Sequence, residues 1–181
     1  MIEISDYQSE WQRQFLQIRN AILPALSEIT TQIEHVGSTS VPGLPAKPII
    51  DIDVVITSKS DFNSVKSKLE AMGYQYLGDQ GVPYREAFRC RPEDINHHLY
   101  VCEDGILALQ NHITLRDHLR KNVGDRNRYG ILKRKLAKQF KNDIDAYVEG
   151  KTNFIIEILS KYGIKELDEI IEVNQKSDDK L

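Results

Sequence analysis

The sequence predicts an α/β (α+β) protein. Its residues 1–105 combine strands with helices, and residues 106–172 are built from helices alone. Two observations carry this prediction. Short runs rich in Ile, Val and Tyr, bounded by Gly, Pro and Asp, recur as far as residue 102, which is typical of strands. After Gly105, three long segments place apolar residues at helical spacing instead. At 181 residues the chain suits one domain, and residues 173–181 are expected to be a frayed tail.

The composition is that of an ordinary globular protein, with 40% hydrophobic and 28% charged residues. No apolar run approaches the roughly 20 residues that a membrane helix needs. The polar start MIEISDYQSEWQRQF does not resemble a signal peptide, and two cysteines do not form a disulfide framework. We therefore expect a cytoplasmic protein that makes no membrane contact.

The first elements are a long helix and two strands. Residues 6–29 repeat large apolar side chains at helical spacing, and Pro24 is expected to kink or break the helix there. Residues 31–37 form a short strand that ends at Gly37. A turn follows, with at most a short helix because Pro42 and Gly43 interrupt it. KPIIDIDVVIT, residues 47–57, is the strongest strand in the chain.

The remaining elements follow from caps and periodicity. Residues 60–74 form a helix that Ser60 or Asp61 caps and Gly73 ends. Short strands are expected over 74–78, 84–90 and 96–102. Helical spacing then covers residues 106–122, 125–140 and 145–163.

Two aspartates in the strongest strand form the first candidate site. Alternate residues of a strand share a face, so Asp51 and Asp53 stand on one side and Ile50, Ile52, Val54 and Ile56 on the other. Strand rise alone puts the two Cβ atoms about 6 to 7 Å apart, close enough for the ionised carboxylates to repel. A divalent cation such as Mg²⁺ between them would remove this repulsion. The alternative is that one acid pairs with Lys47 or an arginine and the other faces water.

The turn before this strand adds a candidate phosphate site. Gly37 allows close approach of a ligand, and Ser38 and Thr39 supply hydroxyls beside backbone amides that favour phosphate. The competing interpretation is simple N-capping by these residues. A phosphate-binding turn next to a metal site is the arrangement that phosphoryl or nucleotidyl transfer requires.

Basic residues could extend this site, among them Lys47 at the strand entry, which could pair with Asp51 or contact phosphate. Arg85 and Arg89 share one strand face and could reach a triphosphate, although surface ion pairing explains them equally well. Residues 112–141 carry a local charge of +8 and leave −11 for the rest of the chain. Within them, Arg116 and Arg120 share a helical face at the edge of an apolar stripe, where they could bind a triphosphate or an anionic acceptor. A solvated helix face is the alternative, and contact with nucleic acid is a less favoured one.

Several other chemistries are not indicated. The chain has no P-loop, no dinucleotide-binding glycine motif and no nucleophile elbow. His97 and His98 are adjacent on a strand and point in opposite directions. His112 and His118 are six residues apart and do not form a metal-binding pair at i, i+4 spacing.

The segment HVGSTSVPGLPAKPIIDIDVVI, residues 35–56, resembles the signature of the GrpB family (UPF0157), which is placed in the nucleotidyltransferase superfamily. The resemblance covers nearly the whole chain. It includes the Tyr7, Trp11 and Phe15 spacing, residues 72–88, HHLYVCEDG, LRDHLR, Tyr129, LKRKLA and the Tyr147, Lys151, Phe154 and Ile155 pattern.

The resemblance implies a small mixed sheet flanked by helices, with Gly37 and Ser38 as the phosphate motif and Asp51 and Asp53 as the metal-binding acids. Superfamily enzymes commonly add a third acid on a later strand. Here Asn96 or His98 stands near that place, and a metal-binding His98 would favour Mn²⁺ or Zn²⁺ over Mg²⁺. A similar domain is fused to dephospho-CoA kinase in some relatives, which hints at a ligand related to CoA.

These observations predict a nucleotidyltransferase that uses Mg²⁺ or Mn²⁺ and a nucleoside triphosphate, with an acceptor hydroxyl that the sequence does not identify. Two alternatives stay open. One is a catalytically silent module that binds a nucleotide or a CoA precursor, and the other is a basic surface that binds RNA or a protein.

Overall fold

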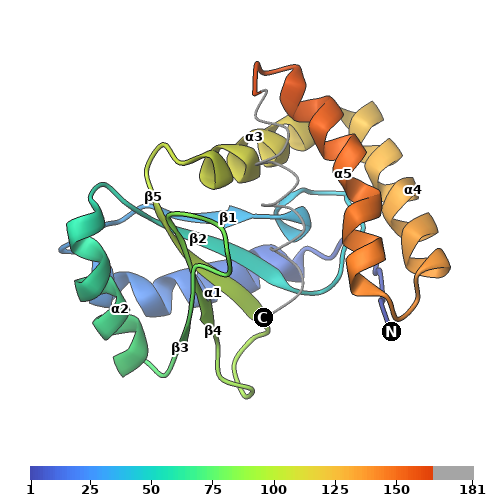
Figure 1. Ribbon diagram of the computed structural model, residues 1–181. Helices are drawn as coiled ribbons and strands as arrows, with labels where there is room; N and C mark the ends of the chain where they lie inside the picture. Colours follow the sequence, from blue (N-terminus) through green and yellow to red (C-terminus); the bar gives the residue numbers. More distant parts are fainter. Residues whose placement is uncertain (165–181) are drawn as a thin grey trace.

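The computed structural model describes residues 1–164, and its central element is a five-stranded mixed sheet (Figure 1). The strands are β1 (Ile33–Val36), β2 (Ile50–Ile56), β3 (Gln75–Gly78), β4 (Arg85–Arg89) and β5 (His97–Glu103), in the order β1-β2-β5-β4-β3. The β2 and β5 strands pair in parallel, whereas all other neighbours are antiparallel. The predicted small mixed sheet is therefore confirmed.

One face of the sheet is covered by α1 (Glu10–Leu26) and α2 (Phe62–Ala71), and its core is apolar. The side chains of Ile50, Ile52, Val54 and Ile56 lie in this core with residues of α1 such as Trp11, as the alternation of β2 predicts. Burial of these β-branched side chains between sheet and helices is the main stabilising term of this half. The other face of β2 therefore carries Asp51 and Asp53.

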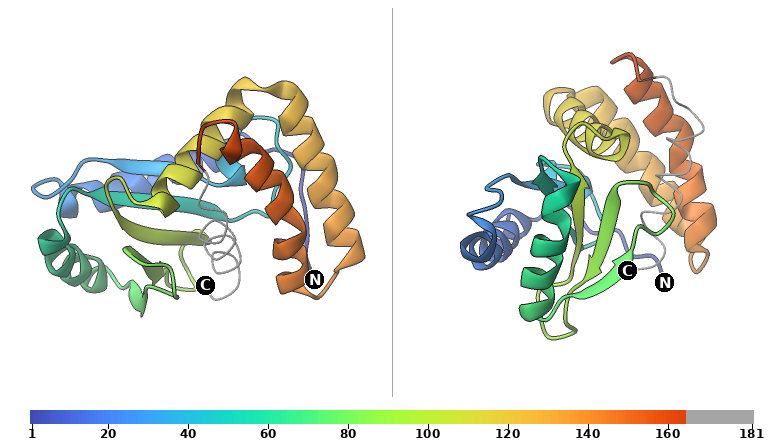
Figure 2. Two further views of the ribbon diagram at one scale, coloured as in Figure 1. Left: turned by 45° about the horizontal axis from the view of Figure 1, so that its top comes forward. Right: turned by 60° about the vertical axis from the view of Figure 1, so that its left-hand side comes forward.

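Three helices cover and extend the opposite face. They are α3 (Leu107–Lys121), α4 (Val123–Gln139) and α5 (Ile144–Ser160), and they confirm the predicted C-terminal helices. The first of them packs Leu109 against Tyr100 and Cys102 of β5. Figure 2 shows α1 and α5 on opposite sides of the sheet, with α4 and α5 standing beyond its end. The candidate site is lined by residues of the sheet and of all three helices.

Two local details differ from the sequence predictions. The α1 helix continues through Pro24 to Leu26, because a proline three residues from the end removes little of the remaining hydrogen-bond ladder. The cap before α2 is also different. Ser58, which precedes a short 3₁₀ turn, η2 (Lys59–Asp61), accepts a hydrogen bond from the Ser60 amide, and Asp61 makes no capping bond.

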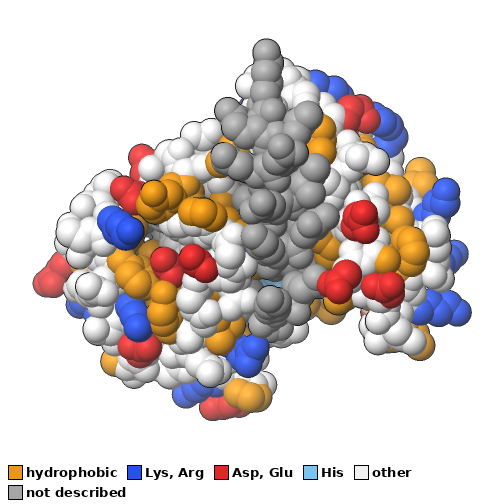
Figure 3. Space-filling view, viewed as in Figure 1, with side chains coloured by type: hydrophobic (Ala, Val, Ile, Leu, Met, Phe, Trp, Pro, Cys, Tyr) orange, Lys and Arg blue, Asp and Glu red, His pale blue; other side chains and the backbone are white. Residues whose placement is uncertain are grey.

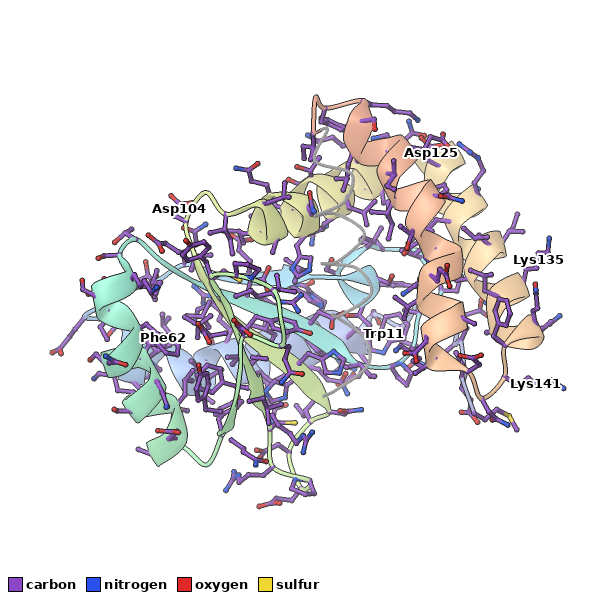
Figure 4. All side chains as sticks on the ribbon, in the orientation of Figure 1. Trp11, Phe62, Asp104, Asp125, Lys135 and Lys141 are labelled. Carbon is purple, nitrogen blue, oxygen red and sulfur yellow. The ribbon has the colours of Figure 1, made fainter. Side chains whose placement is uncertain are left out.

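A buried ion-pair cluster joins the three C-terminal helices. His118 of α3 contacts Asp125 of α4 at 2.8 Å through Nε2, and Arg128 and Lys161 also bind the Asp125 carboxylate. The hydrogen bond from His118, helped by Lys161 and Arg128, lowers the pKa of Asp125 to about 2 against the cost of burial. Asp125 is labelled in Figure 4, beside the C-terminal helices. The cluster fixes α3 against its neighbours, and α3 carries residues of the candidate site.

No helix within residues 1–164 is long and apolar enough to span a bilayer. The predicted tail, residues 173–181, and the last part of the segment expected to be helical, up to residue 172, lie outside the described residues.

Candidate functional site

A cleft of about 130 Å³ lies where the sheet meets the C-terminal helices. The sheet side contributes the turn η1 (Ser38–Ser40) with Gly37 before it, Lys47, Asp51 of β2 and His98 of β5. The helical side contributes His112 and Arg116 of α3, Lys133 of α4 and Lys151 of α5. The structure therefore brings the predicted turn, one of the two acids and several basic residues into a single space.

The turn packs directly on the acid pair. Gly37 has φ +66° and ψ −173°, a conformation that is essentially restricted to glycine. A Cβ atom on this residue would lie 2.0 Å from Asp51 Oδ2, so glycine is required for close packing as well as for the backbone. Ser38 is partly exposed in the cleft, and its hydroxyl makes no hydrogen bond to any residue in 1–164. Ser38 is thus free to bind a ligand.

Thr39 has a structural role that the sequence did not reveal. It is only 2% exposed, and its hydroxyl donates to the Ile49 carbonyl at 3.1 Å. The only hydroxyl proton is then in use, so the contact of 3.1 Å with His35 Nε2 requires the imidazole to donate. Burial lowers the pKa of His35 to about 4, opposed by Asp51 and reinforced by Arg120 and Arg116, so the ring is neutral at pH 7. This hydroxyl therefore holds the turn between β1 and β2, and its contact with phosphate stays a prediction that the geometry does not favour.

Each aspartate is paired with a histidine. Asp51 Oδ1 lies 3.0 Å from His98 Nδ1, because β2 and β5 are parallel and put residues 51 and 98 side by side. Asp53 Oδ2 lies 2.8 Å from His112 Nδ1 on α3. The Asp53 side chain is 0% exposed, whereas that of Asp51 is 27% exposed and faces the cleft. His112 is a site residue that the sequence analysis missed.

The acid pair retains two carboxylate oxygens for a cation. Asp51 Oδ2 and Asp53 Oδ1 accept no hydrogen bond from any described residue, and Asp53 Oδ1 is fully buried. A buried carboxylate oxygen without a partner is costly, and a divalent ion would satisfy it. The residues thus fit a metal ion with two protein oxygens that completes its coordination with water or ligand phosphates. Three or more His, Cys, Asp or Glu ligands do not converge anywhere in residues 1–164.

The arginines of α3 form hydrogen bonds that connect this helix to β1 and to the turn η1. Arg116 binds the Glu34 carboxylate at 2.7 Å, the His35 carbonyl at 3.1 Å and Asp117 at 2.8 Å. Arg120 donates two hydrogen bonds to the Ser40 carbonyl, at 3.0 and 2.8 Å. Both arginines therefore hold α3 on β1 and the turn. Arg116 lines the cleft, but its guanidinium is already bonded to three acceptors. Ligand binding by either arginine stays a prediction that this geometry does not favour.

The arginines of β4 differ from each other. Arg85 is 0% exposed, with its guanidinium carbon 4.5 Å from the ring centre of Tyr100, and it is not part of the cleft wall. Its contact with a triphosphate stays a prediction that this burial does not favour. Arg89 is exposed and lies beside His98 across the β4–β5 pair, also outside the cleft wall.

Two lysines from the helices enter the cleft. Lys133 is 2% exposed and its ammonium lies 5.0 Å from the ring centre of Tyr129. Lys151 is 9% exposed and lies 4.7 Å from the ring centre of Tyr147. By contrast, Lys135 and Lys141 point away from the sheet (Figure 4). These two ammonium groups, each packed against an aromatic ring, give the helical wall a positive charge shielded from bulk water, which favours anions.

Comparison with known proteins gives the family. The family model described as GrpB protein matches residues 1–161. The chain belongs to the GrpB family. A UPF0157 protein of Streptomyces coelicolor is 37% identical over 162 residues, which cover 90% of this chain and 84% of that protein. The crystal structure of the conserved protein GrpB from Enterococcus faecalis superimposes with a TM-score of 0.78 at 33% identity, covering 89% of this chain and 99% of that one.

More distant matches concern the fold and part of one relative. The Cid1 poly(U) polymerase, in a crystal structure with MgGTP bound, has a TM-score of 0.53 at 15% identity over 75% of this chain and 44% of that chain. This likeness confirms the nucleotidyltransferase fold that the GrpB signature implies. A dephospho-CoA kinase of Mycolicibacterium paratuberculosis is 26% identical over 78% of this chain, but the match spans 41% of that protein.

Proposed function

We propose that this GrpB protein binds the phosphates of a nucleoside triphosphate in the cleft, together with Mg²⁺ or Mn²⁺, and transfers the nucleoside monophosphate to an acceptor hydroxyl. One observation carries the proposal. A glycine-dependent turn and the Asp51 carboxylate face Lys133 and Lys151 across one cleft. Beside Asp51 on β2, the buried Asp53 has a carboxylate oxygen without a hydrogen bond. Phosphates require cations on several sides, and this cleft supplies them from both walls.

The residues divide the work as follows. Ser38 and the turn backbone would bind phosphate oxygens from one side, and Lys47, Lys133 and Lys151 from the others. The remaining oxygens of Asp51 and Asp53 would hold the metal ion, which neutralises phosphate charge when bound. The acceptor oxygen forms a bond to the α-phosphorus while the bond to the pyrophosphate oxygen breaks. The acceptor proton leaves to solvent, and pyrophosphate departs.

The size of the cleft limits what it contains. At about 130 Å³ it is smaller than the roughly 300 to 1,000 Å³ of sites that enclose a whole small molecule. We infer that it holds the phosphates, while the base and the acceptor lie at its mouth. A CoA precursor would present phosphate groups to the same walls.

A catalytically silent binding module is the second candidate. On the face that carries Asp51 and Asp53, β5 presents His98 and Tyr100, so this strand adds no third carboxylate. Such a module would bind the same phosphates without turnover.

The test is a thermal-shift and transfer experiment with nucleoside triphosphates and CoA precursors, with and without Mg²⁺ or Mn²⁺. A ligand at about 100 times its Kd adds about 2.7 kcal/mol of stability. Lys133→Met should weaken binding about 10- to 100-fold, because a charged hydrogen bond to phosphate contributes about 1.5 to 3 kcal/mol. Lys138→Met, on the exposed side of the same helix, is the matched control.

The outcomes separate the candidates. Release of pyrophosphate with incorporation of labelled nucleotide supports the transferase, and tight binding without release supports the silent module. If no phosphate ligand shifts the melting temperature, or if Lys133→Met binds like native protein, the proposal is wrong. RNA binding that falls steeply with salt and depends on Lys135 and Lys138 would instead favour the exposed basic face, which Figure 3 shows along the outer edge of the α4–α5 side.

A further inference from the structure

Two histidine–carboxylate pairs share an arrangement, and the cleft wall includes Asp51 and both histidines but not the buried Asp53. In each pair, Nδ1 of the histidine contacts one carboxylate oxygen, at 3.0 Å for His98 with Asp51 and 2.8 Å for His112 with Asp53. In each pair the second carboxylate oxygen has no partner within residues 1–164. The histidines come from β5 and α3, so two separate elements hold the acids of β2 in the same manner.

A third histidine–carboxylate pair, formed by His118 of α3 and Asp125 of α4, serves as a comparison because it joins helices and does not line the cleft. His118 contacts Asp125 at the same 2.8 Å, but both oxygens of Asp125 are used. Its Oδ1 accepts from Arg128, and its Oδ2 also accepts from Lys161. Asp53 is more deeply buried than Asp125 and still lacks a partner for Oδ1. Asp53 therefore differs from Asp125 in keeping one buried oxygen that has no hydrogen-bond partner within residues 1–164.

We propose that His98 and His112 are positioning residues, which fix the carboxylates of Asp51 and Asp53 for the single divalent cation of the proposed function. This inference rests on the metal site of the proposed function. The histidine nitrogens that face the acids are already engaged, so the protein donates oxygens, which Mg²⁺ and Mn²⁺ prefer. One oxygen of each acid contacts a histidine, and the two remaining oxygens supply one pair of ligands for the ion.

His112 is held firmly enough for this role. Its helix is tied to β1 by Arg116, which binds Glu34 and the His35 carbonyl, and to the turn by Arg120. The His112 ring also lies 6.2 Å from that of Tyr100. Partners that orient metal-binding side chains contribute about 10- to 100-fold to metal affinity in other proteins.

The experiment is an Mn²⁺ titration followed by the electron paramagnetic resonance signal of free Mn²⁺, without nucleotide. Native protein should bind one Mn²⁺ per chain, and Asp51→Asn should abolish binding. His112→Asn places an amide donor near the position of Nδ1 and should keep the affinity within about threefold. His112→Leu removes the donor and should lower the affinity about 10- to 100-fold.

The controls separate positioning from stability. His118→Leu breaks the comparable pair on the same helix, so it should lower the melting temperature and leave Mn²⁺ affinity unchanged. If His112→Leu does not fold, His112→Gln replaces it, because its amide extends to the Nε2 position and leaves the Nδ1 position empty.

Three results would overturn the inference: two Mn²⁺ ions per chain, none, or equal affinity in native protein and the variant without the donor. Its failure is distinguishable from that of the proposed function. A protein that binds one Mn²⁺ but no phosphate ligand refutes only the function. Metal-dependent nucleotide binding, with equal Mn²⁺ affinity in native protein and in His112→Leu, refutes only the positioning role.

Discussion

Replacement of Gly37 by alanine should destabilise the protein by about 2 to 4 kcal/mol. The backbone at φ +66° and ψ −173° costs a residue with a side chain about 1 to 3 kcal/mol. The added Cβ would also lie 2.0 Å from Asp51 Oδ2 and 2.8 Å from its Cγ, so Asp51 must move. Displacing Asp51 breaks its hydrogen bond of 3.0 Å to His98, which adds about 1 kcal/mol to the loss of stability.

Urea unfolding followed by circular dichroism measures this cost, and a double-mutant cycle divides it. In an Asp51→Ala background the two nearest atoms are gone and only Cβ of residue 51 stays within 2.9 Å, so Gly37→Ala should cost the backbone share and a reduced steric share. The coupling between the two positions should be about 1 kcal/mol. A loss below about 0.5 kcal/mol, or the same loss in both backgrounds, would refute the argument. The result also matters for ligand assays, because weak binding by Gly37→Ala alone can arise from a displaced Asp51.

Three further outcomes are expected. Burial lowers the pKa of His35 to about 4, below its unfolded value near 6.5, so native protein should lose stability as pH falls from 6.5 to 4, and His35→Gln should flatten that slope in urea melts. The lowered pKa of Asp125 stabilises the folded state above pH 4, and this stabilisation is lost as the pH falls towards 2. In urea melts, Asp125→Asn should therefore lower the free energy of unfolding by about 2 kcal/mol more at pH 7 than at pH 2. Gly150→Ala should lower the melting temperature because its Cβ would lie 2.5 Å from Leu136, and adding Leu136→Ala should reduce the effect of the alanine.

The period of a strand was enough to predict the acid pair. Because β2 is long and strongly apolar, its alternation placed Asp51 and Asp53 on one face and the isoleucines on the other, as the structure confirms. The same alternation correctly pointed His97 and His98 in opposite directions. His97 contacts Tyr74 and His98 contacts Asp51.

The partners of the acids could not be predicted in the same way. His112 lies 59 residues after Asp53 on a helix, and helical spacing does not say how a helix docks on a sheet. Helical spacing correctly placed Arg116 and Arg120 on one helical face. The hydrogen bond from Arg120 to the Ser40 carbonyl could not be predicted, because every residue has a backbone carbonyl and the sequence does not indicate which one accepts. Lys133 is a basic residue in a basic segment, and only the packing of α4 and α5 distinguishes it from exposed neighbours such as Lys138.

The distance in sequence between each acid and its histidine has a consequence for folding. His98 follows Asp51 by 47 residues in the sequence, and His112 follows Asp53 by 59 residues. By contrast, the antiparallel β1–β2 pair joins neighbouring strands and can form locally. The parallel β2–β5 contact closes a long loop and is expected to form late. Until then, two carboxylates repel each other on the half-formed sheet. Folding should therefore speed up with moderate salt or a divalent cation, and the cleft should be the last part of the protein to assemble.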